Sequence, residues 1–183
     1  MVKVGNEAAG AMPDSQRRHW DKAFASKPHM FGDSPSEPAQ AAAPLFHRDG
    51  KTEILELGGG QGRDALFFAQ DGFHVTVLDY SAEGVKAITE RASASGLSKA
   101  VAALCHDVRL PLPLPDASFD ACYSHMLFCM AFTTVELESL AQEVMRVLKP
   151  GGLCVYTVRH TGDPHYRVGT HRGEDMYEIN EFI

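Results

Sequence analysis

The sequence predicts an α/β fold, a Rossmann-like three-layer sandwich around a mainly parallel sheet, from three observations. Short apolar runs alternate with segments of helical periodicity, which is the pattern of successive β-α-β units. The first run, residues 54–57, leads directly into a glycine-rich turn at residues 58–62. Several runs end at an acidic residue. With 183 residues, the chain is long enough for one domain with a sizeable core.

The expected elements follow in chain order. Trp20, Ala23 and Phe24 at helical spacing predict a helix over residues 15–26, and residues 30–44 are expected to form a loop and then a short helix. The capping box Thr133-x-x-Glu136 opens a late helix, which the turn at residues 149–152 ends. Strands are expected at residues 54–57, 74–79, 101–105, 119–126 and 153–159, and crossover helices at residues 63–70 and 82–92.

The glycine-rich turn indicates a ligand site. Glycines at 58, 60 and 62 permit positive φ and let a ligand lie directly on the main chain. Residues 60–65 also satisfy the G-x-G-x-x-A fingerprint, so the turn alone leaves an NAD(P)-dependent oxidoreductase or epimerase open. Glu56 favours a different ligand, because a carboxylate at this place repels a pyrophosphate and attracts the positively charged methionyl group of S-adenosylmethionine.

Two further acids stand at the ends of predicted strands. Asp79 ends the second strand, where a ribose-binding carboxylate is expected, and Asp107 follows the third, where it could accept a hydrogen bond from an adenine amino group. The carboxyl ends of parallel strands share one edge of the sheet, so these acids and Glu56 should converge. The pattern therefore predicts one adenosyl-binding crevice.

With these motifs, residues 51–160 resemble the class I S-adenosylmethionine-dependent methyltransferases. The resemblance rests on Glu56-x-Gly58-x-Gly60-x-Gly62, on the two later acids, and on the segments LPLPDASFD and RVLKPGG at residues 112–120 and 146–152. Residues 20–24 and 30–32 look like the cofactor-covering segment of small-molecule methyltransferases of the type 11 and tellurite-resistance kinds. The resemblance implies a cofactor site built from Glu56, Gly58, Gly59, Gly60, Gly62, Asp79, Tyr80, His106, Asp107, Val108 and Ser124.

The resemblance also sets the expected organisation. Residues 1–50 would form a lid helix and a cofactor-covering loop, and residues 51–183 the cofactor-binding core. The family's sheet has seven strands in the order 3-2-1-4-5-7-6, yet only 24 residues follow Arg159. Residues 177–183 could begin a sixth strand, but strands six and seven are expected to be missing or incomplete. The fifth strand would then be a bare edge of the sheet. We expect either that the chain is shortened or that a homodimer or a domain swap covers this edge.

Composition narrows the partners. The 17 basic and 24 acidic residues give a formal charge of −7, which disfavours nucleic acid. No stretch approaches the roughly 20 apolar residues of a membrane span, and residues 1–14 do not resemble a secretory signal, so a cytoplasmic protein without membrane contact is expected. The cysteines at 105, 122, 129 and 154 are expected to be reduced and mostly in the core.

The predicted activity is methyl transfer from S-adenosylmethionine by in-line displacement to an unidentified acceptor, with a small molecule favoured. His125, after the fourth strand, is the first candidate for a general base, and His160, after the fifth, is the second. His125 could instead only pack or orient the cofactor. The histidine- and acid-rich tail fits no zinc spacing, so no metal is expected. A catalytically silent cofactor-binding module remains the alternative.

Overall fold

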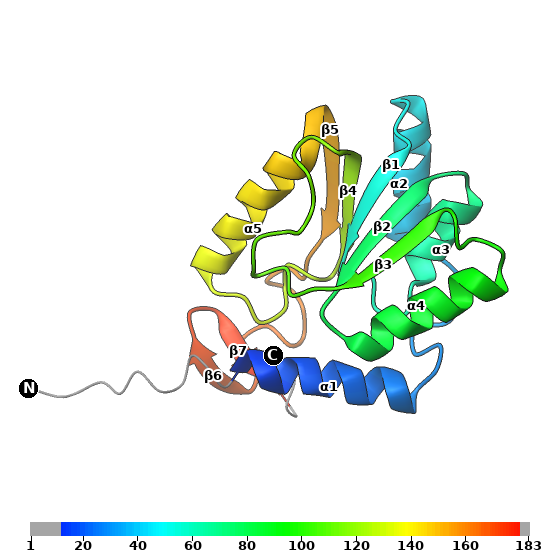
Figure 1. The fold of residues 1–183 in the computed structure, drawn as a ribbon. Helices are drawn as coiled ribbons and strands as arrows, with labels where there is room; N and C mark the ends of the chain where they lie inside the picture. Colours follow the sequence, from blue (N-terminus) through cyan, green and yellow to red (C-terminus); the bar gives the residue numbers. More distant parts are fainter. Residues whose placement is uncertain (1–11, 180–183) are drawn as a thin grey trace, which may run out of the picture.

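A central sheet with helices against both of its faces dominates the computed structural model, which describes residues 12–179 (Figure 1). In chain order the elements are α1 (Met12–Ser26), α2 (Glu37–Arg48), β1 (Glu53–Leu57), α3 (Arg63–Gln70), β2 (His74–Asp79), α4 (Ala82–Ala94), β3 (Val101–Cys105), β4 (Phe119–His125), α5 (Thr134–Val147), β5 (Leu148–Thr157), β6 (Thr170–Gly173) and β7 (Met176–Glu178). The expected α/β architecture is thereby confirmed.

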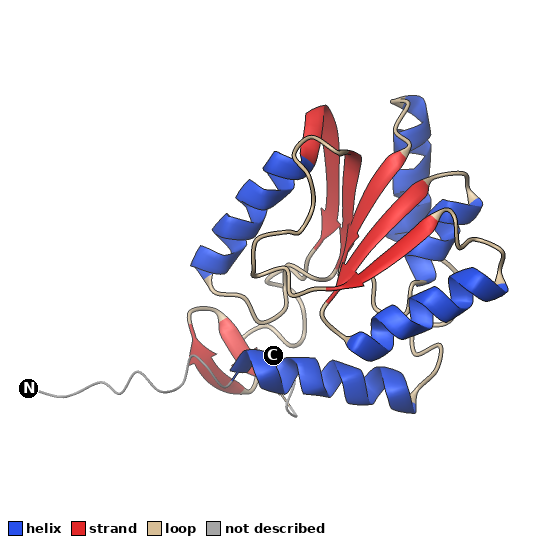
Figure 2. Ribbon diagram, viewed as in Figure 1, coloured by secondary structure: helices blue, strands red, loops and turns tan. Residues whose placement is uncertain are grey.

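The main sheet has five parallel strands in the order β3-β2-β1-β4-β5, and β6 and β7 form a separate antiparallel pair (Figure 2). The chain leaves β1 for β2 on one side and later returns to place β4 on the other side. The strand order therefore reverses between β1 and β4. In open parallel sheets, a crevice forms outside the carboxyl ends of the strands at such a reversal.

The core has two layers, because successive strand residues point to opposite faces. Ile54 of β1 packs with side chains of α2, α3 and α4, among them Phe46 and Phe68. Leu55 and Leu57 of the same strand pack on the other face with side chains of α5, among them Leu140. The two clusters cover both faces of β1, which explains why this strand is almost continuously apolar. Only Glu56 interrupts its four buried positions.

Helix α1 lies across the carboxyl ends of the strands rather than against a face of the sheet (Figure 1). It contacts α4, and the carboxylate of Asp21 accepts a hydrogen bond of 2.6 Å from Ser81 Oγ at the start of that helix. Ser81 Oγ in turn accepts from Gly84 N at 3.1 Å and so caps α4. The N-terminal helix is thus tied to the edge at which the predicted ligand site lies.

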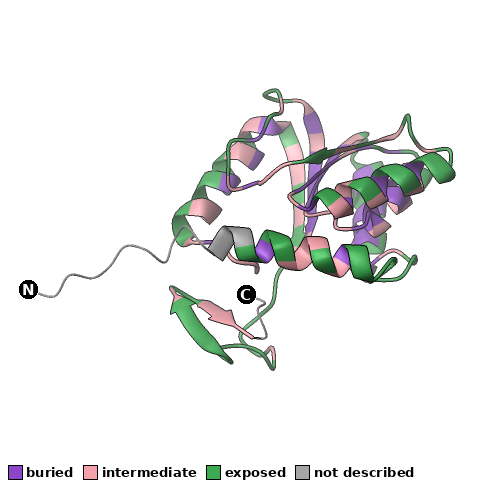
Figure 3. Cartoon of the chain, turned by 60° about the horizontal axis from the view of Figure 1, so that its bottom comes forward, coloured by how far each residue is buried: buried purple, intermediate pink, exposed green. Residues whose placement is uncertain are grey.

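The carboxyl-terminal part differs in detail from the expectation. Helix α5 ends at Val147 and β5 starts at Leu148, so residues 149–152 belong to the strand, with a register shift opposite Phe119 and Ala121. Residues 177 and 178, expected to begin a sixth strand of the sheet, pair instead with β6. The hairpin is exposed or half-buried (Figure 3). Residues 180–183 lie outside the described part of the chain.

Strand β5 pairs with β4 and has no second neighbour among residues 12–179. A homodimer or domain swap at this edge therefore stays a prediction.

The burial of the cysteines corrects another expectation, because only Cys122 is buried, while Cys129 is half-buried and Cys105 and Cys154 are exposed. The two exposed thiols lie on the edge strands β3 and β5, which have fewer covering neighbours. Among the described residues, no helix combines the length and apolar character that crossing a membrane requires.

Candidate adenosyl-ligand site

The glycine-rich turn connects β1 to α3 and has no room for side chains at two positions. Gly62 has φ of +81°, and a Cβ there would lie 2.8 Å from Ile88 Cγ1. A Cβ on Gly59 would lie only 2.4 Å from Val77 Cγ1. Glycine is required at both positions, by backbone conformation at the first and by close packing against β2 at the second. The turn therefore exposes main-chain groups to the crevice.

Asp79, the last residue of β2, holds this turn in place. One carboxylate oxygen accepts from Gly60 N at 2.8 Å, and the other accepts from Ser81 N at 2.8 Å. Burial raises the pKa of Asp79 to about 6, although these two backbone hydrogen bonds oppose the shift. Each oxygen keeps a further lone pair, so the carboxylate can still accept from a ligand in the cavity.

Glu56 presents an unsatisfied oxygen. The residue is 3% exposed, and its Oε2 atom has no hydrogen-bond partner among the described residues. Burial raises the pKa of Glu56 well above its usual range, and the nearby charges of Asp64 and Asp79 add to the shift. Buried polar atoms are almost always paired in folded proteins, so an orphaned acceptor that lines a cavity indicates a ligand that donates to it.

The end of β3 supplies a second group of polar side chains. Asp107 forms an ion pair of 2.6 Å with Arg109. Burial alone would raise the pKa of Asp107, but its hydrogen bonds with Arg109 outweigh that effect and the pKa is lowered. Beside it, His106 Nε2 is buried without a hydrogen-bond partner in the described structure. Asp107 is therefore a fixed carboxylate, and His106 offers the second orphaned polar atom of the cavity.

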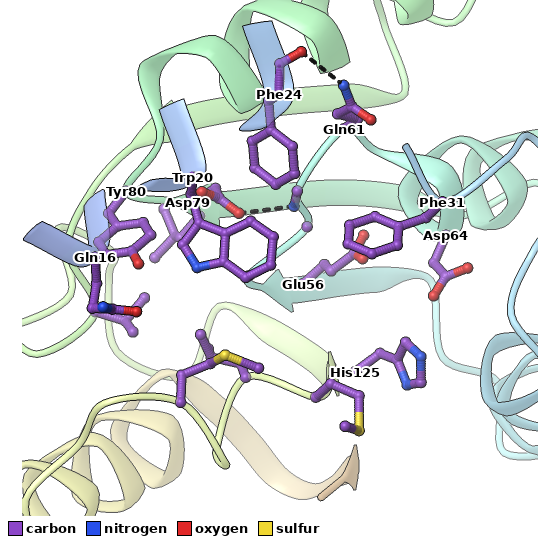
Figure 4. Close-up of a pocket in the computed structure, with 18 of the residues that line it drawn as sticks. Gln16, Trp20, Phe24, Phe31, Glu56, Gln61, Asp64, Asp79, Tyr80 and His125 are labelled. Carbon is purple, nitrogen blue, oxygen red and sulfur yellow. Dashed lines mark hydrogen bonds between the residues drawn. The ribbon is translucent and has the colours of Figure 1, made fainter. Parts of the chain in front are cut away.

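These residues surround a cavity of about 360 Å³ at the carboxyl ends of β1, β2, β3 and β4. Figure 4 shows Trp20 and Phe24 on one side of it and His125 on the other, with Glu56 between them. Ten of the sequence-predicted site residues line the cavity together: Glu56, Gly58, Gly59, Gly60, Asp79, Tyr80, His106, Asp107, Val108 and His125.

Three other candidates do not line it. Gly62 is the N-cap residue just before α3, and Ser124 is buried with its hydroxyl donating to Leu57 O at 3.1 Å. His160 is exposed beyond the end of β5, where its Nδ1 accepts from Gly162 N at 3.0 Å. The structure thus gathers nine of the eleven cofactor candidates and His125 around the cavity, and Gly62, Ser124 and His160 are not among its lining residues.

Aromatic side chains close the cavity on the side of α1. Trp20 and Phe24 have ring centroids 5.3 Å apart, and each lies 6.4 Å from the ring of Phe31. A Cβ on Gly60 would lie 3.4 Å from Phe24 Cζ, so this ring rests directly on the glycine-rich turn. The cluster shields the carboxylates from water, which strengthens their attraction for a cation.

Gln61 is a site residue that the sequence analysis did not identify. Its side chain is buried and accepts from Met30 N at 2.8 Å, while its amide nitrogen donates to Phe24 O at 3.3 Å and to Lys27 O at 3.0 Å. All three partners lie in the last turn of α1 or just after it (Figure 4 draws the bond to Phe24). A residue inside the glycine motif therefore fastens the N-terminal helix over the cavity. No local pattern reveals this, because the partners are more than 30 positions away.

His125 lies on the opposite wall. Its Nδ1 atom is 2.7 Å from Thr157 Oγ1 on β5, and the same oxygen accepts from Met126 N at 3.1 Å. Burial lowers the pKa of His125, which favours the neutral form of the imidazole that a general base requires. Met126 has a φ of +65°, which is a strained conformation for a residue with a side chain and one that concentrates at functional sites.

Comparison with known proteins agrees with this geometry. Residues 54–152 match the model of a family described as a methyltransferase domain. The rice 24-methylenesterol C-methyltransferase 2 is 31% identical over 144 residues, covering 74% of this chain and 38% of that protein. The 2-methyl-6-phytyl-1,4-hydroquinone methyltransferase of Synechocystis is 34% identical over 110 residues, covering 57% of this chain and 31% of that protein.

The fold also matches solved methyltransferases. Phosphoethanolamine N-methyltransferase 1 of Haemonchus contortus, solved with phosphoethanolamine and S-adenosylhomocysteine, aligns with a TM-score of 0.66 at 17% identity, over 94% of this chain and 37% of that one. The chain therefore belongs to the family of methyltransferase domains, and its resemblance to the class I S-adenosylmethionine-dependent enzymes is confirmed. It spans about a third of the length of the two curated relatives described above.

Proposed function

We propose that the cavity binds S-adenosylmethionine and that the chain transfers its methyl group to a small molecule. The observation that carries the proposal is the buried, unpartnered Oε2 of Glu56 beside the glycine-rich turn. The methionyl ammonium is a cationic donor that would satisfy this oxygen. A pyrophosphate would instead meet Glu56 and Asp79, both buried and both lining the cavity, and would be repelled by them.

The remaining cavity residues suit the other parts of this ligand. Asp79 has lone pairs left for the two ribose hydroxyls, in addition to its bonds with the backbone. The orphaned His106 Nε2 and the backbone around Asp107 and Val108 face the place assigned to adenine, a ring that both donates and accepts hydrogen bonds. The glycine-rich turn would hold the methionyl part.

The bound cofactor supplies an activated methyl group on a sulfonium, which is an excellent leaving group. The chain's task is then to hold an acceptor atom in line with that methyl at about 3 to 3.5 Å and to exclude water. His125 serves as the base for an acceptor that must lose a proton. In this assignment Nδ1–H donates to Thr157 Oγ1, which leaves Nε2 as the basic nitrogen and makes Thr157 a positioning residue.

The wall around His125 suggests the character of the acceptor. Met126, Leu127, Met130 and Phe132 line the cavity there, so most of this wall is apolar. Relatives named as sterol and hydroquinone methyltransferases act on molecules with large apolar bodies. Both facts support a small acceptor with an apolar body and one nucleophilic atom.

Transfer of a radiolabelled methyl group from S-adenosylmethionine to a panel of apolar phenols, amines, thiols and alkenes tests the proposal. We expect label in at least one acceptor class. For acceptors that lose a proton, His125→Asn should lower the rate about 10²- to 10⁴-fold with little change in cofactor affinity. Thiolate acceptors serve as the control, since they need no base. Cofactor binding without transfer to any acceptor would favour the silent binding module instead.

A further inference from the structure

Two free thiols lie side by side on neighbouring strands, away from the cofactor cavity. Cys122 on β4 and Cys154 on β5 are register partners in the parallel sheet. Residues directly opposite each other on adjacent strands point to the same face, and such strands lie about 4.8 Å apart. This spacing falls within the Cα separations of about 4.4 to 6.8 Å that a disulfide bond spans. Neither cysteine lines the cavity.

The two thiols have opposite environments. Cys122 is fully buried in the cluster beneath α5, whereas Cys154 is exposed on the edge strand. The neighbouring Cys122 thiol lowers the pKa of Cys154. The proximity of Cys154, together with burial, raises the pKa of Cys122 well above its usual range. Cys154 is therefore the thiol of the pair that a reagent in solution reaches first, and Cys122 lies beside it in the core.

Cys105 offers an internal comparison. It is also exposed and lies on the other edge strand, β3, but it has no cysteine beside it in register. Its thiol donates to Tyr80 O at 3.5 Å. Burial and the nearby carboxylates of Asp21 and Asp79 raise its pKa. The two exposed cysteines of the chain thus differ in that only Cys154 has a second cysteine as its register partner.

We propose that Cys122 and Cys154 form a redox-active pair in which Cys154 reacts with hydroperoxides and Cys122 resolves the product to a disulfide. The Cys154 thiolate attacks one peroxide oxygen, the O–O bond breaks, and the departing alkoxide or hydroxide takes up a proton. The Cys122 sulfur then attacks the sulfenic acid on Cys154, the S–S bond forms, and the hydroxide leaves with the Cys122 proton as water. The two thiols lose two electrons, and the peroxide gains them.

The first test compares Cys154 with Cys105 in the unaltered chain. The protein is treated near neutral pH with limiting hydrogen peroxide or iodoacetamide, and modification at each cysteine is followed by peptide mass spectrometry. We expect Cys154 to react at least about threefold faster than Cys105 with both reagents. Equal rates, or a faster Cys105, would overturn the proposal. Because no cofactor is present, this result is independent of the proposed methyl transfer.

The second test concerns the resolving step. After peroxide treatment, non-reducing digestion should yield a peptide that joins Cys122 to Cys154, lighter by two hydrogens and separated by dithiothreitol. Cys154→Ser, an exposed and conservative change, should abolish that peptide and leave Cys122 unoxidised. Cys122→Ala should leave a trappable sulfenic acid on Cys154, and the unaltered chain covers the case in which this core variant does not fold. A Cys154 that oxidises to sulfinic acid while Cys122 stays reduced would contradict the pairing.

Discussion

Replacing Glu56 by glutamine separates the ligand-binding role of this residue from its effect on folding. Glutamine has nearly the same shape, but it has no charge and presents one acceptor oxygen instead of two. The orphaned Oε2 of Glu56 is the atom that we assign to the methionyl ammonium. A charge-assisted hydrogen bond is worth about 1.5 to 3 kcal/mol, so its loss should raise the Kd for S-adenosylmethionine roughly 10- to 150-fold.

The same change should leave the protein without ligand as stable as before, or make it more stable. The folded-state pKa of Glu56 is raised well above the unfolded value, chiefly by burial. The glutamate therefore destabilises the fold at neutral pH, and this penalty fades as the pH falls below the unfolded pKa. Glutamine removes the titration, so any gain in unfolding free energy should be largest near pH 7 and vanish in acid.

Calorimetric titration gives the affinity, and urea unfolding at two pH values gives the stability. Glu53→Gln is the matched control, because Glu53 lies on the same strand, is half-exposed and bonds to His74 Nδ1 at 3.0 Å outside the cavity. It should change neither quantity appreciably. Unchanged affinity in Glu56→Gln, or an equal loss in the Glu53 control, would refute the assignment of Glu56 to the ammonium group.

Three further predictions concern other parts of the molecule. Gln61→Leu removes three hydrogen bonds to the end of α1 and the residues just after it, so it should speed release of S-adenosylmethionine at least about tenfold in stopped-flow experiments. An unchanged off-rate would mean that α1 does not retain the ligand. Asp79 has a pKa of about 6 in the ligand-free protein, so binding below pH 6 should ionise it, release a proton and weaken as the pH falls. Calorimetry in two buffers of different ionisation enthalpy would detect this proton in the Glu56→Gln variant, in which residue 56 no longer titrates, and no proton release there would argue against a ribose contact. The Asp120 carboxylate accepts hydrogen bonds from the backbone of residues 52 and 53 and forms an ion pair with Lys149 at 2.9 Å. Asp120→Asn should therefore lower the unfolding free energy by about 1 to 3 kcal/mol near neutral pH and by less in acid. Equal urea midpoints for the two proteins would contradict a stabilising role for Asp120.

Elements with a strong local signal could be predicted from the sequence alone. The five strands of the main sheet have dense apolar runs, and the capping box at the start of α5 is present as expected. Thr133 Oγ1 accepts from Glu136 N at 3.2 Å, and Glu136 Oε2 accepts from Thr133 N at 2.7 Å. The convergence of Glu56, Asp79 and Asp107 followed from strand direction, since parallel strands bring their carboxyl ends to one edge.

Features that depend on distant contacts could not be predicted. The bonds of Gln61 to α1 and of His125 to Thr157 join segments about 30 residues apart or more, and nothing in the local sequence marks them. The pairing of Cys122 with Cys154 requires the register of two strands separated by a whole helix. The β6–β7 hairpin has weak apolar alternation, and its position depends on Glu174, which accepts from Thr134 N at 2.6 Å.

The choice of ligand is the central claim, and a paired titration tests it most directly. The protein is titrated with S-adenosylmethionine and, separately, with NADH under the same conditions. We predict saturable one-to-one binding of S-adenosylmethionine, competed by S-adenosylhomocysteine, and no heat from NADH. Binding of NADH that S-adenosylmethionine displaces, or the absence of any adenosyl ligand binding, would contradict the account.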